Sequence, residues 1–96
     1  MIKSLADKLT RDIYDGVNSR NARKVPVEIH ERARRLLDQI NAAPSLGFLR
    51  TPPANRLEKL AGKLYGYWSL RINDQWRIIF RWEGTDALDV QIIDYH

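Results

Sequence analysis

The chain has 96 residues and no cysteine, which excludes disulfide bonds and cysteine-ligated metals and predicts one domain, residues 1–96, with a single modest core. No apolar run is long enough to cross a bilayer, and the first residues are too charged for a signal peptide, so we expect a cytoplasmic protein. The formal net charge of +4 is compatible with either a polyanion or an acidic protein as partner.

The chain begins with a short apolar segment followed by a weak helical pattern. Residues 1–6 are expected to form an edge strand. Apolar residues recur at every fourth position from Leu5 to Ile13, which predicts a helix over residues 7–14. Gly16 is expected to end this helix, and the polar, basic stretch after it is expected to be a loop.

The strongest pattern in the sequence is a long amphipathic helix over residues 25–43. Pro26 suits the first turn of a helix, and Pro44 ends it. His30 lies within this helix beside charged residues, and we expect its side chain at the surface. The apolar stripe of the helix recurs at helical spacing and consists of Ile29, Ala33, Leu36, Leu37 and Ile40.

The second half of the chain has the pattern of an antiparallel β-meander. Strand-like alternation occurs over residues 65–73, 75–82 and 87–96, and two short turns separate these segments. The apolar side of the three strands consists of Trp68, Leu70, Ile72, Trp76, Ile78, Phe80, Trp82, Leu88, Val90 and Ile92. Because the long helix must bury its apolar stripe, we expect it to pack on this face and to form a two-layer α+β domain.

Arginine and tyrosine side chains mark the polar side of the same strands. Arg71, Arg77 and Arg81 lie on neighbouring strands and can form one patch. Two interpretations are open: a phosphate-binding surface, or a solvated outer face in which the arginines pair with nearby carboxylates. Tyr65 and Tyr67 are less constrained by the core and can stack on nucleobases.

The last strand ends on Asp94, Tyr95 and His96, which are an acid, a phenol and an imidazole. The end of a paired strand is held by its neighbours, whereas an unpaired end is a solvated tail. His96 can transfer a proton near neutral pH, Tyr95 can orient or donate, and Asp94 can hold the imidazole. Two histidines without cysteine give no recognisable metal-ligand spacing, so we expect neither a metal nor a cofactor.

The segment "PPANRLEKLAGKLYGYWSLRINDQWRIIFRW", followed by the terminal "DYH", resembles the HigB toxins of bacterial type II toxin–antitoxin systems. These toxins are also called plasmid-maintenance killer proteins and belong to the RelE/ParE superfamily. The resemblance is strongest to the GraT-like subgroup, covers essentially the whole chain, and is most specific from Pro52 to His96. It implies a RelE/ParE-like two-layer domain with an N-terminal strand, two helices and then an antiparallel meander.

The resemblance implies a ribosome-dependent endoribonuclease that cuts messenger RNA in the A site of the small subunit and stops translation. It also implies a HigA-type antitoxin with a helix-turn-helix domain, and a complex of two toxins with two antitoxins. No membrane partner is implied. The alternative is a non-catalytic member of the superfamily, either a ParE-like gyrase inhibitor or a corepressor acting with its antitoxin. The terminal histidine favours the nuclease.

The reaction of such toxins, attack of a ribose 2′-hydroxyl on the adjacent phosphate, needs a base, an acid and cations for the developing charge. The resemblance places the C-terminal catalytic residues of the family at Asp94, Tyr95 and His96, and the strand arginine of "QWRI" at Arg77. The residues expected to contact RNA are Lys63, Tyr67, Arg71 and Arg81.

Glu58 departs from the family pattern, because well-studied HigB toxins carry a histidine at this position of "RLEKL". The GraT-like subgroup also lacks that histidine. A glutamate can act as a base but cannot be cationic, and it can equally cap a turn. The identity of the general base is therefore open, and we expect a weaker or differently selective nuclease.

Overall fold

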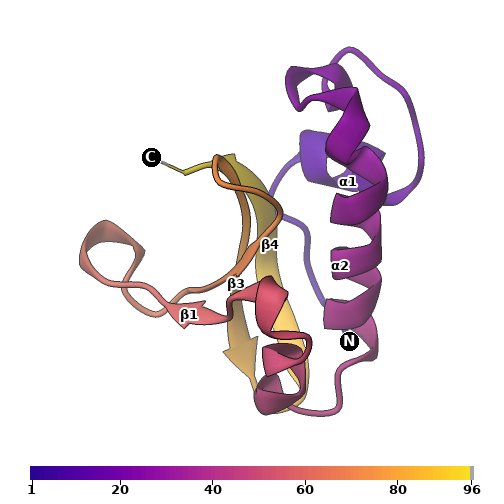
Figure 1. Ribbon diagram of the computed structural model, residues 1–96. Helices are drawn as coiled ribbons and strands as arrows, with labels where there is room; N and C mark the ends of the chain where they lie inside the picture. Colours follow the sequence, from indigo (N-terminus) through magenta and orange to yellow (C-terminus); the bar gives the residue numbers. More distant parts are fainter. Residues whose placement is uncertain (96) are drawn as a thin grey trace.

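The helical layer lies on one face of a four-stranded antiparallel sheet in the computed structural model, which describes residues 1–95 (Figure 1). The helices are α1 (Lys8–Tyr14) and α2 (His30–Ala42), and the strands, in their order across the sheet, are β1 (Glu58–Lys59), β2 (Trp68–Arg71), β3 (Trp76–Glu83) and β4 (Asp86–Asp94). Both helices lie on one side of the β3–β4 pair, and the β1–β2 connection projects on the other side (Figure 1). The predicted α+β class and its two layers are confirmed. No helix within residues 1–95 has the length and apolar character needed to cross a membrane.

The N-terminal segment lies beside β4 but is not a regular strand. It runs parallel to β4 and forms isolated bridges to Ala87 and Val90. Between these bridges the backbone N–H of Asp89 donates to the Ser4 hydroxyl at 2.8 Å instead of to a backbone carbonyl. The predicted edge strand is therefore in the expected position beside β4. Where β4 is irregular, the Ser4 hydroxyl takes the place of a backbone carbonyl as the hydrogen-bond acceptor.

Helix α1 begins where the sequence indicates. The Asp7 carboxylate accepts a hydrogen bond from the backbone N–H of Thr10 at 2.9 Å and caps the helix. Asp12 is buried on the same helix, and its carboxylate accepts from the Ser19 hydroxyl at 2.6 Å and from the Lys8 ammonium at 3.1 Å. The hydrogen bond from Ser19, followed by that from Lys8, holds the pKa of Asp12 below its usual value of 3.8.

Asp12→Asn should therefore remove part of the acid sensitivity of folding. A carboxyl whose pKa is lower in the folded state stabilises the fold above pH 3.8, and this contribution disappears as the pH falls through the lower folded pKa. The difference in the free energy of unfolding between the wild type and Asp12→Asn should be constant from pH 7 to 5 and should shrink below pH 4. Urea titrations at each pH measure it, with Asp15→Asn as the matched exposed variant. A difference that stays constant to pH 2 would contradict the role of Asp12.

Helix α2 starts later than predicted, and this changes the place of His30. A 3₁₀ turn, Val27–Ile29, precedes the helix, which begins at His30. The expectation of a surface histidine was wrong: His30 is 7% exposed, and its Nε2 lies 2.9 Å from the carbonyl oxygen of Val25. The cause is helical spacing, since position 30 precedes Ala33 and Leu37 on the buried stripe. The rest of the predicted stripe is buried, apart from the half-buried Ile29.

The apolar face of the sheet is buried as predicted, except at a β-bulge in β4. Ile79 pairs with Gln91, but the next pair is Arg81 with Leu88, so β4 has one extra residue at this point. Asp89 takes a φ of +52° there. Leu88, which was expected on the core face, is half-buried, and Ala87 is buried instead. The three tryptophans pack as partly buried residues against the core.

Candidate active site

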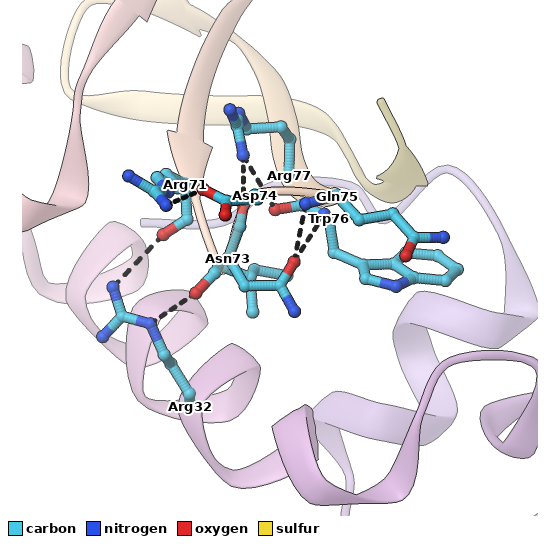
Figure 2. Close-up of polar contacts among 8 residues, drawn as sticks. Arg32, Arg71, Asn73, Asp74, Gln75, Trp76 and Arg77 are labelled. Carbon is cyan, nitrogen blue, oxygen red and sulfur yellow. Dashed lines mark hydrogen bonds and ion pairs between the residues drawn. The ribbon is translucent and has the colours of Figure 1, made fainter. Parts of the chain in front are cut away.

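The turn between β2 and β3 is fixed by hydrogen bonds within itself. The Asn73 side-chain oxygen accepts from the backbone N–H of Gln75 at 2.9 Å and from that of Trp76 at 2.8 Å. The backbone N–H of Ile72 donates to the Trp76 carbonyl at 2.9 Å. Figure 2 shows these contacts converging on one compact turn. The sequence "INDQW" thus forms a rigid connection that sets the ends of β2 and β3.

Arg77 follows this turn on the face of the sheet opposite the helices. It is half-buried, and its guanidinium donates to the backbone carbonyls of Asn73 and, at 3.4 Å, Trp76. The guanidinium carbon lies 5.6 Å from the ring centroid of Tyr95, within the range of a cation–π contact. Within residues 1–95 no carboxylate lies close enough to form an ion pair with Arg77. Among residues 1–95 its charge is therefore contacted by neutral groups alone.

The other two arginines of the predicted patch are paired with acids. Arg71 forms an ion pair with Asp74 in the turn (Figure 2). Arg81 contacts the Asp89 carboxylate through both Nε, at 3.0 Å, and a terminal nitrogen, at 2.9 Å. Asp89 lies at the bulge in β4, where Arg81 has Leu88 as its ladder partner, and the Arg81–Asp89 ion pair is present despite this shift in register. For these two arginines the structure therefore matches the interpretation of a salt-bridged outer face.

The end of β4 is attached to the β2–β3 turn. The backbone N–H of Tyr95 donates to the Gln75 carbonyl at 2.7 Å, and the Gln75 side-chain amide donates to the Asp94 carboxylate at 3.1 Å. Asp94 pairs with Trp76 in the ladder, so strand alternation directs Asp94 and Tyr95 to opposite faces. His96 lies outside the described residues. The structure brings Arg77 and Tyr95 together on one face and places Asp94 at the same end of the sheet.

Glu58 shares a face with Arg77 but does not touch it. Glu58 pairs with Ser69, and Ser69 pairs with Ile79, two residues after Arg77. Glu58 is thus two strands away from β3 and, along β3, two residues away from Arg77. With strands about 4.8 Å apart and about 3.3 Å per residue, the Cα atoms of Glu58 and Arg77 are roughly 12 Å apart. The exposed Glu58 side chain and the Arg77 guanidinium thus border opposite sides of one surface.

The β1–β2 connection holds the remaining predicted RNA contacts. Lys63 is exposed on a 3₁₀ turn, Gly62–Leu64, and Tyr67 is half-buried at the base of the connection. Tyr65 is 76% exposed, and the Lys59 ammonium lies 6.0 Å from its ring centroid. The contact between Lys59 and Tyr65 was not predicted from the sequence. The one signal for it is the spacing of the two residues on either side of the β1–β2 connection.

Within residues 1–95 no three His, Asp or Glu side chains are grouped so that they could hold a metal ion. What the site offers is a fixed guanidinium with an aromatic ring against it. The Glu58 carboxylate lies across the same face, and Asp94 lies at the same end of the sheet on the opposite face. A guanidinium presented in this way can stabilise negative charge that develops on a phosphate.

The whole chain is similar to several known proteins. The family described as "RelE-like toxin of type II toxin-antitoxin system HigB" matches residues 3–96. A protein named Toxin HigB-1 from Vibrio cholerae serotype O1 is 35% identical over 92 residues, which are 96% of this chain and 95% of that protein. A protein named Endoribonuclease HigB from Proteus vulgaris is 33% identical over 97 residues, covering 100% of both chains.

A solved structure extends the likeness to the fold. The YoeB/ParE toxin from Agrobacterium tumefaciens superposes with a TM-score of 0.53 at 22% identity, covering 96% of each chain. At this identity the likeness concerns the fold alone.

Proposed function

Because the chain belongs to the HigB family of RelE-like toxins of type II toxin–antitoxin systems, we propose that this endoribonuclease acts on messenger RNA in the ribosomal A site. A toxin of this kind has an antitoxin partner. We further propose that this partner is a HigA-type helix-turn-helix protein, that two toxins and two antitoxins form the complex, and that the toxin acts in the cytoplasm, where its ribosomal substrate is.

The observation that carries the proposal is the position of the Arg77 guanidinium. It lies over the Tyr95 ring, 5.6 Å from the ring centroid, at the end of the last strand. It also has no ion-pair partner among residues 1–95, whereas Arg71 and Arg81 do. A fixed and unneutralised cation can stabilise the charge on a phosphate in the transition state without first breaking an ion pair.

In the proposed reaction the base removes the proton of a ribose 2′-hydroxyl, and the oxygen attacks the adjacent phosphorus. The bond from phosphorus to the 5′-oxygen breaks, and an acid gives that oxygen a proton. The products are a 2′,3′-cyclic phosphate and a 5′-hydroxyl. Arg77 is proposed to stabilise the phosphorane, and Tyr95 to hold the guanidinium and face the phosphate. His96, Asp94 and Glu58 are the candidates for proton transfer.

The separation of Glu58 and Arg77 is compatible with this scheme. Their Cα atoms are roughly 12 Å apart along the sheet, a span that the two side chains and one ribose-phosphate unit can fill. Glu58 then borders the 2′-hydroxyl side of the scissile bond, and the end of β4 borders the leaving oxygen. The exposed Lys63 and the half-buried Tyr67, with Arg71 and Arg81, are proposed to contact RNA outside the scissile bond.

Translation in vitro with a defined messenger tests the proposal, with cleavage mapped by primer extension. We expect cuts inside the A-site codon that appear only when ribosomes are present. Arrest of translation without any cut would contradict the proposal. In that case, inhibition of gyrase-catalysed supercoiling would support the ParE-like alternative.

Tyr65→Ala should weaken binding to ribosomes without slowing the chemical step. A base stacked on an aromatic ring contributes about 1–3 kcal/mol, so we expect the apparent KM for ribosomes to rise about 10-fold or more. The rate at saturating ribosomes should remain within about 2-fold of the wild type, and Tyr65→Phe should retain wild-type affinity. Phe48→Ala removes an aromatic ring that is 52% exposed elsewhere on the surface and is the control. Equal affinity of Tyr65→Ala and Phe48→Ala would exclude a stacking role.

A further inference from the structure

One side chain of the helical layer reaches across to the β2–β3 turn. Arg32 of α2 donates from Nε to the Ile72 carbonyl at 2.7 Å and from a terminal nitrogen to the Arg71 carbonyl at 3.3 Å. Figure 2 shows this guanidinium approaching the turn from the helix, on the side away from Arg77. Arg32 is half-buried, so water competes only partly with these hydrogen bonds.

The two carbonyls lie where β2 leaves the sheet, since β2 ends at Arg71. Hydrogen bonds from a charged donor are roughly twice as strong as those between neutral groups. The planar guanidinium also fixes two acceptors at once, which a single amine does less well. Through these two hydrogen bonds Arg32 anchors the end of β2 to helix α2.

The same turn supports both members of the candidate site. The Asn73 carbonyl accepts a hydrogen bond from the Arg77 guanidinium, and the Gln75 carbonyl accepts from the backbone N–H of Tyr95 at 2.7 Å. A shift of the turn thus moves the cation and the end of β4 together. Hydrogen bonds and the backbone of the turn together connect Arg32 to Arg77 and Tyr95.

We propose that Arg32 is a positioning residue for the Arg77–Tyr95 pair, acting from the helical layer through the β2–β3 turn. The proposal deepens the proposed function and rests on it for its catalytic consequence. A loss of position should lower the rate of the chemical step more than the affinity, since a displacement of about 1 Å can cost about 100-fold in rate.

The test compares three variants of the full chain. Arg32→Met keeps much of the side-chain length and removes the donors, and Arg32→Lys keeps the charge with a single amine. Arg35→Met alters an exposed arginine of the same helix and is the matched control. Thermal unfolding first establishes that each variant is folded.

Two measurements then separate positioning from stability. Amide hydrogen exchange followed by NMR should show the Tyr95 amide exchanging about 10-fold faster in Arg32→Met, with the amides of α1 unchanged. Ribosome-dependent cleavage should show kcat about 10- to 100-fold lower with KM within about 2-fold of the wild type. Arg32→Lys should be intermediate in both measurements, and Arg35→Met should match the wild type.

A folded Arg32→Met with wild-type exchange at Tyr95 and wild-type kcat would overturn the proposal. If Arg32→Met does not fold, Arg32→Lys decides: intermediate exchange and kcat support positioning, and wild-type values of both overturn it. If the wild type makes no ribosome-dependent cuts, the proposed function fails. The exchange of the Tyr95 amide then still decides whether Arg32 holds the turn.

Discussion

Arg77→Met is expected to lower the rate of ribosome-dependent cleavage by about 10²- to 10³-fold, the usual effect of removing one group that stabilises transition-state charge. The guanidinium is held by the carbonyls of Asn73 and Trp76 and by the ring of Tyr95. None of these neutral contacts has to be broken when a phosphate approaches. The measurement is the single-turnover rate on programmed ribosomes at saturating ribosome concentration.

Two further variants make the Arg77 prediction specific. Arg77→Lys keeps a positive charge but loses the planar guanidinium that lies over the Tyr95 ring, so it should recover only part of the lost rate. Arg81→Met removes an arginine of the same strand that is already paired with Asp89, and it should change the rate by less than about 3-fold. Equal losses in Arg77→Met and Arg81→Met would show that general positive charge matters and that a fixed guanidinium does not.

The interpretation of a salt-bridged face describes Arg71 and Arg81, and phosphate binding stays a proposal for Arg77. Arg71 and Arg81 pair with acids, whereas Arg77 is held by carbonyls and a ring. Strand alternation predicted that all three share a face, because alternation depends only on sequence parity. The partners of the two paired arginines are Asp74 in the β2–β3 turn and Asp89 on the neighbouring strand. Parity alone does not say which of the three arginines has such a partner.

The layers and most of the core followed from local patterns. The stripe of α2 follows from helical spacing and is buried as predicted. In β3 the predicted core residues Ile78 and Phe80 are buried, but Ile79, which was predicted on the polar side, is buried as well. His30 was wrongly predicted at the surface, because nearby residues in the sequence are charged although its own helical position lies on the buried stripe. Leu88 was wrongly assigned to the core because a bulge depends on how two strands pair.

The candidate site was less predictable than the fold, because its supports come from distant parts of the chain. The contact from Arg32 to Ile72 spans 40 residues of sequence. The bond from Tyr95 to Gln75 depends on a turn whose own hydrogen bonds come from the Asn73 side chain. The sequence indicated Arg77 and Tyr95 as candidate functional residues. The residues that hold them in place, such as Asn73 and Gln75, are identified by the arrangement of the strands and the turn.

His96→Ala should lower the cleavage rate by about 10²- to 10⁴-fold, the range expected for the loss of a general acid or base. This residue lies outside the described residues, and its role is proposed from the terminal "DYH". Glu58→Gln is the matched test of the other proton-transfer candidate, since it removes an exposed carboxylate and keeps its size. Single-turnover rates across pH 5 to 9 measure both variants.

The rates of these two variants assign the base. If Glu58 is the base and His96 the acid, both variants should be slow across this pH range. If Glu58 only borders the RNA, Glu58→Gln should change the rate by less than about 3-fold, so His96 and Asp94 would remain for the proton transfers. A His96→Ala variant that cleaves at the wild-type rate would remove the imidazole from the mechanism. Catalysis would then depend on Arg77, Tyr95 and the two carboxylates.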